Sequence, residues 1–321
     1  MRRRPPLPLP TWSAGAIVAA IVLAGCGAPG PPVVSAGPSA PSAPISPISP
    51  MPDPEPAVDG LLIAASGPIQ VTGETGGLVA FPGSPDEVAA VATGGGRIIA
   101  IDPPGTAFTA DALASPVQWQ PLDLSGVDDL STLVAVSPDG RRMAMVAGGL
   151  QGDAFDLVIV DLPGGTARRL TIQRGANGPP AWLDDTTVVT DVITPDGASG
   201  IAAIDVDGGA VTDRVGPGIE VAFSADGSRV VLIADGGVVL IEDAAAWRSG
   251  AADGAVRLPG RPDQTTERVA ISPTGSRAAV VRSSTAGPTT IEIWLLGDGR
   301  WANAVSIPLG GDGPATIAWL R

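Results

Sequence analysis

The chain lacks histidine, tyrosine and lysine, and it has a single cysteine among its 321 residues. These absences exclude Ser–His and Cys–His nucleophile pairs, histidine metal ligands, and proton transfer by histidine or tyrosine. No G-x-S-x-G turn occurs, and a P-loop is excluded because its lysine is missing. Carboxylates are therefore the main groups left for any catalysis.

Basic and aromatic residues are also scarce. Acidic residues outnumber basic ones by 33 to 19, the net charge is −14, and aromatic residues make up 3% of the chain. An acidic surface repels DNA, RNA and anionic lipid headgroups. We therefore expect no nucleic-acid partner.

Three acidic segments are candidates for a cation site or for acid–base chemistry. Asp128-Asp129 and Asp184-Asp185 are adjacent pairs, but neighbours on a strand point to opposite faces, which favours solvated turns. Asp205–Gly209 imitates the start of a calcium loop and lacks the later ligands. Gly94-Gly95-Gly96 favours a hairpin turn over a phosphate cradle. We accordingly predict no catalytic residue, metal ligand or cofactor.

The N-terminus has the pattern of an export signal. Three arginines, at positions 2–4, precede the apolar run 12–25, whose 14 residues fall short of the about 20 that span a bilayer. The run closes as Leu-Ala-Gly-Cys at residues 23–26, which resembles the bacterial lipobox. The resemblance implies cleavage after residue 25 and a diacylglyceryl group on Cys26. The alternative is an ordinary signal peptide followed by an incidental cysteine.

Lipidation of Cys26 would place the protein outside the cytoplasm, held on the bacterial cell membrane by acyl chains, since two or more chains anchor a protein stably. Residues 26–58 would form a lipidated linker rich in Pro, Ser and Ala. Such a composition cannot bury enough apolar surface to fold. It is either a spacer through a cell-wall layer or a passive tail.

Residues 59–321 contain an internal repeat. The clearest copies align without gaps: Ala135–Val146 (AVSPDGRRMAMV), Ala222–Ile233 (AFSADGSRVVLI) and Ala270–Val281 (AISPTGSRAAVV). Weaker copies begin at Ala80, Ala181 and Ala318, and the equivalent positions are Ser84, Ser137, Leu183, Ser224, Ser272 and Leu320. A spacing of roughly 47 residues is typical of four-stranded propeller blades.

Each copy has the local chemistry of a blade. A short apolar strand meets a Ser-Pro-Asp-Gly turn, in which Pro presets φ, Asp bonds its own backbone and Gly takes the left-handed conformation. The strands that follow, such as Leu157–Val160, are almost continuously apolar, as in sheets covered on both faces.

These Ser-Pro-Asp-Gly hairpins resemble those of the TolB-type, or WD40-like (PD40), β-propellers. The resemblance implies an all-β, six-bladed ring. An open ring would leave strand edges unpaired. We therefore expect the stub Ala315–Leu320 to be completed by the N-terminal strands Leu61–Ala65 and Pro68–Thr72, so that the two ends of the domain close the ring.

The tryptophans divide by repeat position. Trp182 and Trp319 occupy equivalent places and are expected in the core. Trp119, Trp247 and Trp301 lie nearer loops or outer strands, where they could contact a protein or glycan or could simply pack.

In propellers the loops between second and third strands, and between blades, gather on one face. The repeat places on this face eight acidic residues: Asp128, Asp129, Asp153, Asp191, Asp235, Asp263, Glu267 and Asp312. Arg174, Arg261 and Arg268 are the opposing charges. Such a face would attract a basic partner; the alternative is that it reflects only a generally acidic chain. We expect a protein-binding or scaffolding lipoprotein with a protein partner of unknown identity; the alternative is a propeller enzyme, such as a glycosidase, that uses carboxylates alone.

Overall fold

The computed structural model describes residues 60–73, 77–124, 127, 130–147, 156–162, 164–170, 178–193, 199–216, 218–250, 254–285, 287–310 and 315–320. The chain divides into two units, Met1–Pro52 and Asp53–Arg321, and every described residue belongs to the second. The expected signal segment, Cys26 and the linker lie outside the described residues.

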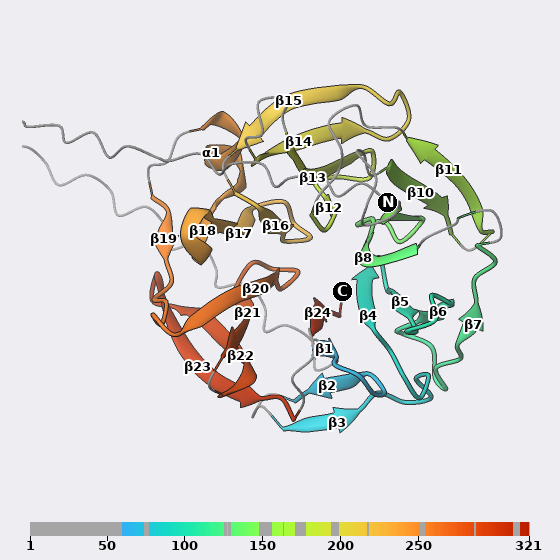
Figure 1. Ribbon diagram of the computed structural model, residues 1–321, viewed down its shortest axis with the longest axis horizontal. Coiled ribbons are helices and arrows are strands. Elements are labelled where there is room, and N and C mark those ends of the chain that lie inside the picture. Colours follow the sequence, from blue (N-terminus) through green and yellow to red (C-terminus); the bar gives the residue numbers. More distant parts are fainter. Residues whose placement is uncertain are drawn as a thin grey trace, which may run out of the picture. The chain divides into compact units, whose positions relative to one another are not determined.

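The described part is a ring of six antiparallel sheets, each of four strands, which confirms the six-bladed propeller (Figure 1). Listed from the inner to the outer strand, three blades are β24 (Thr316–Trp319), β1 (Leu61–Ala64), β2 (Gln70–Thr72), β3 (Leu78–Ala80); β4 (Ala90–Gly94), β5 (Arg97–Ile101), β6 (Ala107–Asp111), β7 (Gln120–Pro121); and β8 (Leu130–Val136), β9 (Arg142–Ala147), β10 (Asp156–Asp161), β11 (Thr166–Leu170). The other three are β12 (Ala181–Trp182), β13 (Thr187–Ile193), β14 (Ser199–Asp205), β15 (Val211–Gly216); β16 (Glu220–Phe223), β17 (Arg229–Ala234), β18 (Val238–Asp243), β19 (Val256–Arg257); and β20 (Gln264–Ile271), β21 (Arg277–Ser284), β22 (Gly287–Gly297), β23 (Arg300–Pro308).

The repeated serine holds the hairpin between the first and second strands. In three blades its hydroxyl oxygen accepts the N–H of the residue five positions later, at 2.9 Å from Arg142 to Ser137 and at 3.0 Å in the Ser224 and Ser272 hairpins. Ser137 is fully buried. The glycine of the same turn has a φ of +71° at position 140, a left-handed conformation that favours glycine.

The alignment of Ser84 with these serines is wrong. Ser84 lies in the connection between β3 and β4, whereas the hairpin of that blade joins β4 to β5 through Gly95 and Gly96. Both glycines have positive φ, so the predicted glycine hairpin is confirmed. Ser84-Pro85-Asp86 has the composition of the repeated turn but stands at the opposite end of the inner strand.

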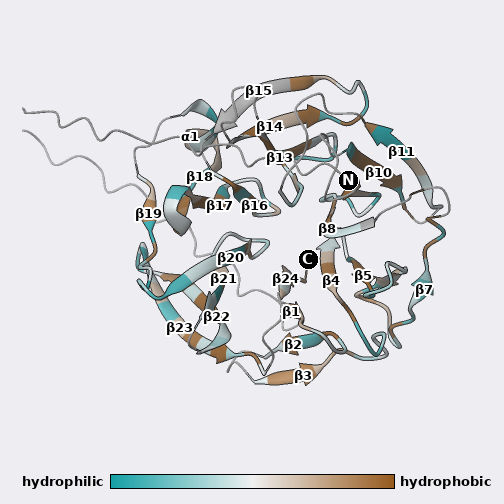
Figure 2. Cartoon of the chain, viewed as in Figure 1, coloured by the Kyte–Doolittle hydropathy of each residue, from teal (hydrophilic) through white to brown (hydrophobic). Residues whose placement is uncertain are grey.

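The middle strands carry the core, as expected for sheets covered on both faces. Figure 2 shows β10 and β17 as strongly hydrophobic. Their side chains contribute to clusters that lie between adjacent blades: Val231 and Ile233 pack with Val269, Ile271 and Val280 of the next blade. Such stacking buries both faces of each sheet.

Strands from both ends of the described chain close the ring. β24 pairs antiparallel with β1, with Leu61 opposite Trp319 and Ala64 opposite Thr316. β1 continues to β2, and β2 to β3, so the last blade takes its inner strand from the C-terminal side and its other strands from the N-terminal side (Figure 1). The expected closure is confirmed.

One short helix, α1 (Ala244–Ser249), interrupts the strands. The Asp243 carboxylate caps it by accepting the N–H groups of Ala245 and Ala246, each at 2.9 Å. Gly250 ends it in a left-handed conformation. Within the described residues, no helix has the length and apolar character needed to cross a membrane.

Candidate functional site

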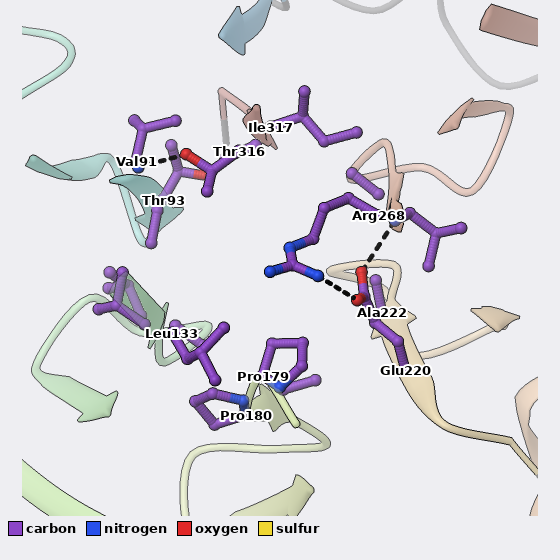
Figure 3. Close-up of a pocket in the computed structure, with 18 of the residues that line it drawn as sticks. Val91, Thr93, Leu133, Pro179, Pro180, Glu220, Ala222, Arg268, Thr316 and Ile317 are labelled. Atoms are coloured by element: carbon purple, nitrogen blue, oxygen red, sulfur yellow. Dashed lines mark hydrogen bonds and ion pairs between the residues drawn. The ribbon is translucent and has the colours of Figure 1, made fainter. Parts of the chain in front are cut away.

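The inner strands of all six blades surround a central cavity of about 150 Å³. Its wall is built largely from small and apolar residues, including Leu133, Pro179, Pro180 and Ile317 (Figure 3). Ala, Thr and Val on the inner strands help to keep this space open, because larger side chains would fill it. A concave site that combines apolar side chains with a few polar groups is the usual form of a small-ligand site.

Glu220 and Arg268 are the charged residues among those that line the cavity. Glu220 begins β16, and Arg268 projects from the neighbouring inner strand β20 (Figure 3). Arg268 Nη1 donates to Glu220 Oε2 at 3.2 Å, and the Val269 N–H donates to Glu220 Oε1 at 2.9 Å. The carboxylate is thus fixed by its two oxygens to the next blade.

The two partners differ in exposure. The Glu220 side chain is 8% exposed, and the Arg268 side chain is 31% exposed. Burial raises the pKa of Glu220 to about 7, although the Arg268 charge and the hydrogen bonds from Val269 and Arg268 act to lower it. The cavity therefore contains a carboxyl group that titrates near neutral pH.

The threonines of the wall connect the closing strand to the next blade. The Val91 N–H donates to Thr316 Oγ1 at 3.0 Å, and the Thr93 hydroxyl donates to the carbonyl oxygen of Trp319. Both bonds join β4 to β24 at the point where the ring closes. These hydroxyls are committed to ring closure.

A second buried ion pair lies in the blade β20–β23. Arg282 Nε donates to Glu292 Oε2 at 2.9 Å, and the side chains are 2% and 5% exposed. Arg282 also donates to Thr266 Oγ1 and to the carbonyl oxygen of Pro259, each at 3.0 Å. The Thr266 hydroxyl in turn donates to the Gly237 carbonyl oxygen at 2.8 Å. This network ties the β17–β18 and β19–β20 loops to β20 and β21.

No family model and no curated protein matches the sequence. Among solved structures, TolB from Acinetobacter baumannii matches at a TM-score of 0.60 and 18% identity, over 82% of this chain and 66% of that one. A putative TolB from Agrobacterium tumefaciens matches at a TM-score of 0.52 and 15% identity, over 78% of this chain and 89% of that one. The fold is that of the TolB-type β-propellers. A crystal structure of a nidogen/laminin complex also matches, at a TM-score of 0.59 and 13% identity, over 82% of this chain and 98% of that one.

This TolB-type propeller brings together only part of the expected acidic face. Asp235 and Asp263 are exposed in the β17–β18 and β19–β20 loops, and Glu267 is half-buried in β20. Asp191 is not in a loop: it lies within β13 and is 5% exposed, because β13 extends further than the repeat suggested. Asp128, Asp129, Asp153, Asp312 and Arg174 lie outside the described side chains and stay predictions.

Two exposed carboxylates of the connection between the β3 and β4 strands were missed. Asp86 and Glu87 lie in the β3–β4 loop, next to Val88, whose N–H donates to the Gly67 carbonyl oxygen of the β1–β2 loop at 2.9 Å. The misalignment at Ser84 had assigned them to the other end of the propeller. The glycine triplet before Arg97 was the signal that could have placed that hairpin correctly.

The remaining acidic candidates hold turns. Asp184 Oδ1 accepts the Thr186 N–H at 2.9 Å, and Asp185 Oδ1 accepts the Asp139 N–H of the preceding blade at 2.9 Å. Asp205 Oδ1 accepts the N–H of Asp207 at 2.9 Å in the β14–β15 turn. Asp207 pairs with Arg142 at 3.1 Å. These groups serve turns and contacts between blades.

The tryptophans mostly pack. Trp182 and Trp319 are each 4% exposed, which confirms them as core residues. Trp247 is 1% exposed and meets Phe223 edge-on, with ring centroids 5.5 Å apart. Trp119 and Trp301 are half-buried. Trp119 meets Phe81 edge-on at 6.3 Å, so the packing interpretation holds for Trp119 and Trp247.

Proposed function

We propose that this chain is an extracytoplasmic lipoprotein whose TolB-type propeller binds a protein partner at the cell envelope. The observation that carries the binding proposal is the charge of three loops at one end of the propeller, β3–β4, β17–β18 and β19–β20. They contain four exposed carboxylates, Asp86, Glu87, Asp235 and Asp263, here called the acidic loop set, and one exposed arginine, Arg261.

Hydrogen bonds to neighbouring elements fix two of these loops. The β1–β2 loop bonds the β3–β4 loop through Gly67 and Val88 at 2.9 Å. The β17–β18 loop bonds β20 through Gly237 and Thr266 at 2.8 Å. Loops fixed by such bonds present their charges without a large ordering cost, which suits recognition of a basic surface.

The alternative, hydrolysis by a carboxylate pair, has less support. A glycosidase needs two carboxyl groups about 5 to 10 Å apart. Of the described residues that line the central cavity, Glu220 alone carries a carboxylate, and both of its oxygens accept hydrogen bonds. We therefore favour binding over catalysis.

The anchor is proposed from the sequence, where Cys26 ends a lipobox-like segment and is the chain's single cysteine. Acyl chains would hold the acidic propeller at the membrane despite its repulsion from anionic headgroups. Expression in a lipoprotein-processing host should yield an N-terminal peptide that begins at Cys26 and carries the acyl mass. An unmodified wild-type N-terminus would exclude the anchor.

The contact surface can be mapped in cells that naturally make the chain. A photoreactive amino acid at position 86 or 263 should give the same discrete crosslinked adduct after irradiation. Asp298, an exposed carboxylate in the β22–β23 turn at the other end of the sheets, is the matched control position. An adduct from position 298 with none from 86 or 263 would refute the proposed surface.

A further inference from the structure

The guanidinium of Arg268 has an unused edge that faces the central cavity. Both hydrogens of Nη1 are taken, one by Glu220 Oε2 at 3.2 Å and one by the Glu267 carbonyl oxygen at 2.7 Å. Within the described part of the chain, Nε and Nη2 make no hydrogen bond to another residue, and the group points toward the middle of the cavity (Figure 3).

Arg268 does not hold Glu220 through two of its nitrogens. Arginine–carboxylate pairs are frequently joined by two parallel N–H bonds from one guanidinium. Glu220 instead receives one N–H from Arg268 and one from the Val269 backbone. The Nε/Nη2 edge, which can hold a carboxylate through two parallel bonds, is left for another acceptor.

The rest of the wall defines what that acceptor can carry. Leu133, Pro179, Pro180 and Ile317 belong to the wall of the cavity that the guanidinium faces, and the prolines supply no N–H donors (Figure 3). A cavity of about 150 Å³ is comparable to one that holds a benzene molecule. The ligand must therefore be small, with one anionic group and a short apolar tail.

We propose that the central cavity binds a small aliphatic carboxylate, held through its two oxygens by Nε and Nη2 of Arg268. The tail packs against Leu133, the two prolines and Ile317. This site lies inside the ring, and it does not depend on the acidic loop set or on lipidation.

Binding should be coupled to protonation of Glu220. When Glu220 is ionised it offsets the Arg268 charge, and when it is protonated the cavity has a net positive charge. Among the described residues, the charged groups near this position include Asp191 of β13, which lies across Gly178 from Ile219, and Glu267, the residue before Arg268 in β20. Ile233 of β17 and Pro179–Trp182 are uncharged. With a pKa of about 7 for Glu220, affinity should rise about tenfold from about pH 8 to about pH 6.

Butyrate and its uncharged analogue butyramide make a matched pair of probes. The full chain labelled with [13C]arginine would be titrated by NMR, and the Arg268 Cζ signal would be assigned as the one missing from Arg268→Gln. Butyrate should shift that signal saturably and more tightly at the lower pH, while butyramide should not shift it. Glu220→Gln should bind butyrate at the higher pH as tightly as the wild type binds it at the lower one.

Arg300→Gln, at an exposed arginine of β23, should bind like the wild type. The proposal is overturned if butyrate gives no saturable shift in the wild type at the lower pH, or if butyramide binds equally well. It is equally overturned if Glu220→Gln, which keeps Arg268, binds no butyrate. Because Glu220→Gln keeps Arg268, this test of the proposal remains valid even if Arg268→Gln fails to fold.

Discussion

At the scale of single residues, Glu220 is where stability and function are most closely linked. A carboxylate at the start of an inner strand has lost most of its hydration, and one arginine nitrogen and one backbone N–H replace it. Burial outweighs these interactions, which is why its pKa rises to about 7 rather than falling.

The raised pKa determines the sign of a pH effect. The unfolded carboxyl has a pKa of about 4.5 and the folded one of about 7, so between these values the folded state holds the proton more tightly. The stabilisation that this group contributes is complete below about pH 4.5. As the pH rises to about 7 that stabilisation is lost, and the free energy of unfolding falls by up to about 3 kcal/mol.

Glu220→Gln removes this titration and keeps an oxygen for the Val269 N–H. The unfolding free energy of the wild type minus that of the variant should therefore fall between about pH 4.5 and about pH 7. Denaturant unfolding at several pH values measures it. A constant difference across that range would show that Glu220 does not titrate there.

At the scale of elements, the serine hairpin shows what a local pattern can predict. Ser137 accepts the N–H of Arg142 and donates to Asp139 at 2.6 Å, all within one turn. Because these contacts are local, the Ser-Pro-Asp-Gly pattern sufficed to identify first and second strands in the clear repeats. The same pattern misled at Ser84, whose hydroxyl donates to the adjacent Pro85 carbonyl oxygen at 3.3 Å.

Ser137→Ala and Ser84→Ala form a matched pair. The first leaves the partly buried Arg142 N–H without its acceptor and should lower the unfolding free energy by about 1–3 kcal/mol. The second, at a half-buried loop position, should change it by less than about 0.5 kcal/mol. Thermal and denaturant unfolding measure both, and equal effects would contradict the assignment of the two turns.

The candidate site was less predictable than the fold. Arg268 was expected among loop charges, yet it projects into the cavity from β20, and Asp191 was expected in a loop, yet it is buried in β13. Both outcomes depend on how far a strand extends and on which neighbour it meets across the ring. Those are contacts between residues distant in sequence, for example Glu220 with Arg268, and the repeat pattern does not predict them.

At the scale of the whole molecule, the ring separates two surfaces with different chemistry. Its interior is a small cavity that contains one ion pair, while the loops at one end expose carboxylates. Closure by β24 and β1 fixes both, because each blade is held between two neighbours. The interior suits a small molecule, and the loop end suits a protein.

The central claim is that the acidic loop set recognises a basic protein partner. Replacing Asp86, Asp235 and Asp263 together by Asn removes three charges and keeps side-chain size, and Asp298→Asn is the control at the other end of the sheets. Exposed charges act mainly on association rate and are screened within about 8 Å at physiological ionic strength.

The decisive measurement is the association rate of the partner captured by the crosslink, for the wild type and both variants, at low and at high salt. The account predicts that at low salt the triple variant associates several-fold more slowly than the wild type and the Asp298→Asn control, and that the difference shrinks at high salt. Equal rates for all three proteins at low salt would contradict it.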